Sequence, residues 1–170
     1  AGLPPVRHVR YHSELAAAQS TVIRSGIIGT GPLAGWVMHR MEEATTGRLA
    51  ATAVEGPGAP VSDALADEAE TLPALPRSID PNLRPGKNEA EMLAAGGLVA
   101  HRCIVTQGEC DAKRRLTQQF HIARFTDGAP HLWDQSGIST NWLMQNGLGR
   151  VAVEMQIRHI IPRRNRRTGH

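Results

Sequence analysis

The predicted architecture depends on residues 47–91, which read GRLAATAVEGPGAPVSDALADEAETLPALPRSIDPNLRPGKNEAE. This stretch has no aromatic residue and contains six prolines, and residues 49–91 carry eight acidic side chains against three basic ones. A segment with so few bulky apolar residues buries too little surface to offset the entropy that it loses on ordering. We therefore predict that residues 49–91 form an extended acidic, Pro-rich linker, of which residues 56–85 lie along another protein subunit.

On the N-terminal side of the linker, residues 1–48 are predicted to form a helical segment. Residues 7–11 alternate in polarity as a short strand does, and a serine cap and a closing glycine then bound a helix over residues 14–25. Pro32 favours the first turn of a second helix, over residues 32–45. The sequence thus predicts two N-terminal helices before the linker.

On the C-terminal side, residues 92–162 are predicted to form an α+β core, followed by a basic arm over residues 163–170. Its elements are strands at residues 98–105, 119–126 and 151–161, short helices at residues 88–95 and 140–145, and turns at Asp127-Gly128 and Asn146-Gly147. The expected fold class is α+β, with two N-terminal helices, the extended linker, a small antiparallel sheet and the arm. The residues expected in the core or at an interface are Trp36, Val37, Met41, Phe120, Ile122, Trp133, Val153, Met155 and Ile157.

The composition of the chain indicates a protein that is stabilised by contacts with other subunits. The chain is 41% hydrophobic but only 4% aromatic, so its core is expected to be thin and supported by other subunits. Two cysteines are too few for a disulfide framework and indicate a reducing intracellular compartment. No apolar run reaches the roughly 18 residues that a transmembrane helix needs. The chain starts at Ala1, the pattern expected after removal of a leader or when the beginning of the protein lies outside this sequence. We predict a mitochondrial location.

The basic arm is the strongest candidate for nucleic-acid binding. It carries Arg163, Arg164, Arg166 and Arg167 directly after a proline that ends the last predicted strand. Arginines on an extended segment suit a phosphate backbone, because each neutralised phosphate releases counterions and no fixed fold is needed. The alternatives are an acidic protein surface and a solvated terminus. We predict RNA contact through the phosphates, without readout of base sequence.

A zinc site is a weaker hypothesis. Histidine and cysteine are the right ligand types, and the candidates are His101, Cys103, Cys110 and His121, with His131 as a substitute. Structural zinc sites usually present two cysteines only two to four residues apart, however, and here six residues separate Cys103 from Cys110. Packed thiols explain the pattern, and neither a metal nor a cofactor is predicted.

The stretch RYHSELAAAQSTVIRSGII, residues 10–28, resembles the opening of the ADP-ribosyltransferase-like toxin folds. In that family an aromatic-histidine-hydroxyl strand end contacts the nicotinamide dinucleotide, and a helix ending in Ser-Gly follows. The resemblance implies that Tyr11, His12 and Ser13 fill the strand end, that Ser25-Gly26 ends the helix, and that Glu154 or Glu109 is the catalytic glutamate. The chain departs from the family after this stretch, because no aromatic-rich second strand follows.

Other catalytic motifs are absent from the sequence, including the P-loop, the nucleophile elbow and the H-E-x-x-H zinc motif. The glycines of IGTGPLAG, residues 28–35, are expected in a turn between two helices rather than in a dinucleotide-binding loop. We therefore predict a non-catalytic structural subunit of a large multi-subunit assembly, such as a mitochondrial ribonucleoprotein or a respiratory complex. The alternative is an ADP-ribosyltransferase-like enzyme or toxin domain that uses NAD.

Overall fold

The computed structural model describes residues 6–56, 68–77 and 89–158. The chain divides into two compact units. One, the sheet unit, comprises residues 1–85 and 152–170, and the other, the helical unit, comprises residues 86–151. Among the described residues, no helix combines the length and apolar character that crossing a membrane requires.

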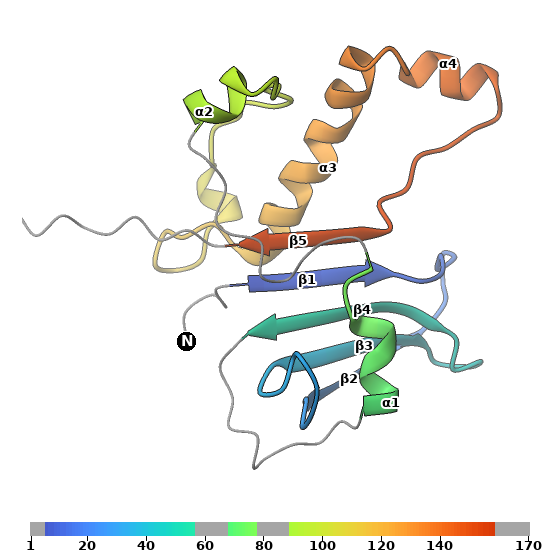
Figure 1. The fold of residues 1–170 in the computed structure, drawn as a ribbon. Helices are drawn as coiled ribbons and strands as arrows, with labels where there is room; N and C mark the ends of the chain where they lie inside the picture. The colour runs from blue at the N-terminus through green and yellow to red at the C-terminus, as the bar shows by residue number, and fades with distance from the viewer. Residues whose placement is uncertain (1–5, 57–67, 78–88, 159–170) are drawn as a thin grey trace, which may run out of the picture. The chain divides into compact units, whose positions relative to one another are not determined.

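The sheet unit contains one five-stranded antiparallel sheet (Figure 1). Its strands are β1 Val6–Tyr11, β2 Thr21–Ile27, β3 Val37–Glu43, β4 Leu49–Gly56 and β5 Glu154–Arg158. The spatial order is β2-β3-β4-β1-β5, so β1 lies between β4 and the C-terminal strand β5. The sheet is therefore completed by two segments from opposite ends of the chain.

The predicted fold class is wrong in its N-terminal half, because the first element is strand β1 and not a helix. The strand expected at residues 7–11 is confirmed as β1. The two expected helices are replaced by β2 and β3, which pair antiparallel from Thr21 opposite Glu43 to Ile27 opposite Val37. The apolar spacing of these residues fits a helix face as well as a strand, and the pairing with neighbouring strands decides the outcome.

The glycine-rich run IGTGPLAG forms the tight connection between β2 and β3. The Ile28 amide donates to the Trp36 carbonyl, and the Gly35 amide donates to the Ile28 carbonyl. Gly31 and Gly35 both have positive φ angles, of 77° and 79°, which side chains other than glycine adopt at a cost. The expected turn between two helices is thus a turn between two strands, and Pro32 lies inside it instead of starting a helix.

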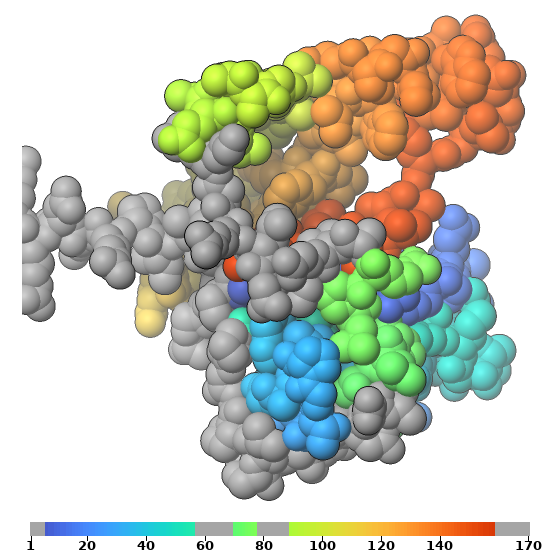
Figure 2. Space-filling model, in the orientation of Figure 1, coloured from blue at the N-terminus to red at the C-terminus, as the bar shows by residue number. Residues whose placement is uncertain are grey.

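The hydrophobic core of the sheet unit lies between one face of the sheet and residues 68–77. These residues contain α1 Glu68–Thr71 and the 3-10 turn η2 Leu72–Ala74, and Figure 2 shows them seated against the strands. The core comprises Ile28, Leu33, Met38, Val54 and Ala74, with Trp36 and Leu75 packed against it. Gly56 touches Trp36 so closely that an added Cβ would lie 2.7 Å from the indole Cγ.

Part of the predicted linker belongs to this unit. Residues 49–56 form β4, and Ala74 of η2 enters the core. The short helix α1 also falls within the predicted linker, which is therefore not extended throughout. The proposed contact of residues 56–85 with another subunit stays a prediction.

The helical unit contains α2 Glu89–Ala94, the 3-10 turn η3 Gln107–Glu109, α3 Gln118–Gln135 and α4 Thr140–Gln145 (Figure 1). The helix expected at residues 140–145 is confirmed as α4, and Ser139 caps it by accepting the Trp142 amide at 3.1 Å. The strands expected at residues 98–105 and 119–126 are wrong. Residues 119–126 and the expected Asp127-Gly128 turn lie inside α3, because alternating Phe120 and Ile122 do not find a partner strand.

The predicted core list is correct only in part. Ile157 is buried and Trp36 packs against the core, as expected. Trp133 and Val153 are exposed, at 38% and 51%, so they lie outside the core, and their place at an interface stays a prediction. The remaining members, Val37, Met41, Phe120, Ile122 and Met155, are half-buried.

A carboxylate holds the turn between β3 and β4. Glu43 accepts the amides of Thr45 and Thr46 at 3.0 and 2.9 Å, and also the Thr46 hydroxyl at 2.5 Å. The hydrogen bonds from Thr46 and Thr45 lower the pKa of Glu43 from 4.5 to about 2. Gly47, with a φ of 69°, then completes the turn.

We expect Glu43→Gln to lower the stability of the protein at neutral pH and to flatten its dependence on pH. Because the pKa of Glu43 is lower in the folded than in the unfolded state, its contribution is fully present above pH 4.5. It is lost as the pH falls through about 2. Urea unfolding at several pH values measures this difference. Glu14→Gln, an exposed change outside the turn, is the control, and equal pH profiles for the two variants would contradict the prediction.

Candidate functional site

A row of polar side chains crosses one face of the sheet. Cross-strand partners on antiparallel strands project from the same face. Four consecutive pairings, Arg24 with Arg40, Arg40 with Thr52, Thr52 with Arg10 and Arg10 with Glu154, therefore align five polar residues over all five strands. We call Arg24, Arg40, Thr52, Arg10 and Glu154 the polar row.

The main chain of residues 70–77, here called the covering segment, is hydrogen-bonded to this row. Arg40 Nη1 donates to the Glu70 carbonyl at 3.0 Å, and Arg10 Nη1 donates to the Leu75 carbonyl at 2.6 Å. The covering segment is also a donor, because the Arg77 amide donates to Glu154 Oε1 at 2.9 Å. Because a buried guanidinium must find acceptors, these carbonyls position the covering segment on the sheet.

Glu154 and His8 form a buried pair beside the row. His8 Nε2 lies 2.7 Å from Glu154 Oε1, and the two side chains are 1% and 4% exposed. His8 belongs to β1 and Glu154 to β5, so the pair links the N-terminal and C-terminal strands. The Glu154 carboxylate thus forms hydrogen bonds with two protein groups, the His8 ring and the Arg77 amide.

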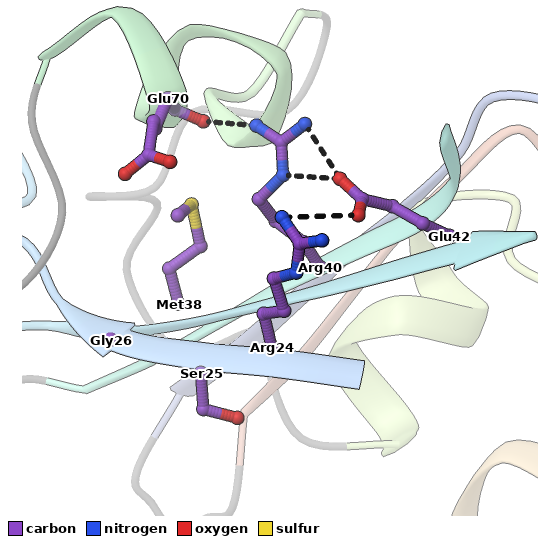
Figure 3. Close-up of a pocket in the computed structure, with 7 residues that line it drawn as sticks. All are labelled: Arg24, Ser25, Gly26, Met38, Arg40, Glu42 and Glu70. Atoms are coloured by element: carbon purple, nitrogen blue, oxygen red, sulfur yellow. Dashed lines mark hydrogen bonds and ion pairs between the residues drawn. The ribbon is translucent and has the colours of Figure 1, made fainter. Parts of the chain in front are cut away.

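A pocket with a volume of about 270 Å³ opens at the β2 end of the row. It is lined by Arg24, Ser25, Gly26, Met38, Arg40, Glu42 and Glu70 (Figure 3). Arg40 donates to Glu42 Oε1 from Nε and Nη2 at 3.2 and 3.1 Å, while Arg24 Nη1 lies 3.7 Å from Glu42 Oε2. Two arginines thus share one carboxylate, and the charges lining the pocket balance.

The two residues of the alternative catalytic hypothesis lie on this face of the sheet. His12 Nε2 is 3.0 Å from the Thr52 hydroxyl. Burial, and then Arg10, Arg77 and Arg40, lower the pKa of His12. Glu154 faces His8 and Arg77 instead. The resemblance to ADP-ribosyltransferases also implies a helix that ends at Ser25-Gly26, whereas both residues lie inside β2.

The zinc candidates belong to the helical unit. Cys103 is exposed, and the Cys110 thiol donates to the Thr106 carbonyl at 3.5 Å. His101 stacks on His131 with ring centroids 6.3 Å apart. Within the described parts of the chain, no group of three or more potential metal ligands comes together, His121 included.

The candidate nucleic-acid residues Arg163, Arg164, Arg166 and Arg167 lie outside the described residues, so their role stays a prediction. The polar row was not predicted from the sequence. A signal for it is the alternation of His8 and Arg10 in β1 and of His12 just after the strand, which places polar side chains on one face of the sheet; His8 and Arg10 are buried there.

We expect Arg10→Met to destabilise the protein by about 1–3 kcal/mol, because the Leu75 carbonyl loses a charged donor. Arg24→Met is the matched control, since Arg24 belongs to the same row but its side chain is largely exposed on β2. Denaturant unfolding measures both variants. Equal losses of stability would show that the hydrogen bond to the covering segment contributes nothing.

The chain was also compared with known proteins. No protein-family model, no curated protein and no solved structure matches it.

Proposed function

We propose that the chain is a structural subunit of a larger assembly and that it binds a protein partner through the helical unit. The observation that carries this proposal is the burial of residues 89–151. Only Gly128 and Leu143 are buried there. The helical unit therefore has almost no interior of its own among the described residues.

Large apolar side chains are exposed throughout this unit. They are Met92, Leu93, Leu98, Val99, Ile104, Val105, Phe125, Leu132, Trp133, Ile138, Trp142, Met144, Leu148 and Val151. Ile104 and Met144 reach 86% and 75% exposure. Exposed apolar surface on this scale marks interaction sites, because isolated soluble proteins rarely leave large apolar patches in water.

The helices themselves support the same proposal. α2 and α4 are six residues each, and α3 has Pro130 in its interior. Helices shorter than about 12–15 residues are marginal alone, and an interior proline removes a main-chain hydrogen bond. The packing that stabilises these helices must therefore come from elsewhere, and a partner supplies it.

The sheet unit fits a structural role better than an NAD-dependent one. The carboxylate of Glu154 is 4% exposed and is bonded to His8 and to the Arg77 amide, so it serves as a link between strands. A catalytic glutamate would instead face a substrate cleft. We retain the mitochondrial ribonucleoprotein and the respiratory complex as the proposed settings, with RNA contact through the C-terminal arginines.

The proposal predicts that changes on α4 release the chain from its assembly. We expect the tagged wild-type chain to sediment with a large complex in native extracts. The double change Trp142→Ser and Met144→Ser should return it to light fractions, because two exposed apolar anchors are lost. Val22→Ser with Ile23→Ser removes exposed apolar residues from β2 and serves as the control that stays in the complex.

A wild-type chain that sediments as a monomer would contradict the proposal. So would an α4 variant that stays in the complex to the same extent as the control. Nuclease treatment of the extract separates an assembly held by RNA from one held by protein. Thermal stabilisation of the purified chain by NAD would favour the ADP-ribosyltransferase alternative instead.

A further inference from the structure

A second set of polar side chains lies on the face of the sheet opposite the polar row. It comprises Ser25 on β2, His39 on β3, Glu55 on β4 and Arg7 on β1. Ser25 is the cross-strand partner of His39, and Arg7 is the partner of Glu55. Figure 3 shows the Ser25 side chain pointing away from the side of β2 that carries Arg24. We call these four residues the serine chain.

The members of the serine chain contact one another in sequence. Ser25 Oγ lies 2.7 Å from His39 Nδ1. On the far side of the ring, His39 Nε2 lies 3.9 Å from Glu55 Oε1. Arg7 Nη2 forms an ion pair with the same carboxylate oxygen and so anchors it. A hydroxyl, an imidazole and a carboxylate are thus arranged in the order found in activated serine nucleophiles.

The arrangement favours the histidine tautomer that can act as a base. The Glu55 carboxylate lies beyond hydrogen-bond distance of His39 Nε2, but its negative charge favours a proton on that nitrogen, which leaves the Nδ1 lone pair for the Ser25 hydroxyl. Burial, and then the charge of Arg7, lower the pKa of His39 below its usual 6.5. The imidazole is therefore neutral at pH 7 and available to accept a proton.

Ser25 is also accessible. It is exposed, and β2 is the outer strand of the sheet, next to β3 only. A reagent can therefore approach the hydroxyl from solvent while His39, half-buried between Ser25 and Glu55, stays in place. Access to the nucleophile combined with a fixed base is the geometry that general-base catalysis requires.

We propose that Ser25 is a nucleophilic serine that accepts an acyl group from an activated carboxylic ester, with His39 as the base and Glu55 as the residue that positions it. Ser25 Oγ attacks the ester carbonyl carbon while its proton passes to His39 Nδ1. The bond to the leaving alkoxide or phenoxide then breaks, and His39 returns the proton to that oxygen. The products are an acylated Ser25 and a free alcohol or phenol. This covalent site is independent of the proposed partner-binding role.

The test treats the full chain with p-nitrophenyl acetate. Peptide mass mapping at successive times then measures the rate at which each serine is acetylated. Ser136 is an internal control, because it is exposed and its hydroxyl donates to the Trp133 carbonyl instead of a histidine. We expect Ser25 to be acetylated far faster than Ser136. His39→Gln should slow acetylation of Ser25 by roughly a hundredfold, the lower end of the range for a general base.

The pH profile separates a base from a merely structural histidine. Arg7, Glu55 and Ser25 are the polar groups in contact with His39 or its partner carboxylate. The rate should rise with pH and level off with a midpoint below 6.5, and Arg7→Gln should raise that midpoint, because the charge of Arg7 lowers the pKa of His39. Equal rates at Ser25 and Ser136, or a His39→Gln variant as fast as the wild type, would overturn the proposal.

Discussion

The sheet unit depends on the interactions that the buried guanidinium of Arg10 makes with the parts of the chain around it. Arg10 lies on the strand between β4 and β5, and its charge must be compensated because it is withdrawn from water. The Leu75 carbonyl supplies a hydrogen bond, and Glu154, its cross-strand partner on β5, supplies the opposite charge. One residue thus ties the covering segment and the C-terminal strand to the N-terminal strand, so three distant parts of the chain order together.

The sequence predicts the local elements better than the long-range pairing. The polarity alternation of β1 and the short helix α4 depend on neighbouring residues, and both predictions are correct. β2 and β3 were missed because their apolar spacing also satisfies a helix, and only their partner strands distinguish the two. Of the candidate site, His12 and Glu154 were singled out from sequence, but the polar row is visible only once β1 is known to lie between β4 and β5.

The two units differ in how far their large apolar side chains are buried. The sheet unit encloses Ile28, Met38 and Val54 beneath the covering segment, and its polar groups are bonded across strands. The helical unit leaves residues such as Ile104 and Met144 in water. The contrast fits the proposed role, in which the helical unit packs on a partner, and the low aromatic content of the chain is consistent with it. The serine chain, for which we propose a nucleophilic role, lies on the same sheet.

Hydrogen–deuterium exchange on the purified chain, read out peptide by peptide, tests most directly whether the sheet unit is stable alone while the helical unit needs a partner. Protection reports the free energy of local opening, and packed elements exchange last. The account predicts slow exchange for the amides of β1, β3 and β4 and fast exchange for those of α3 and α4 in the absence of a partner. Protection of α3 equal to that of β4 in the isolated chain would contradict it, because the helical unit would then be stable without an assembly.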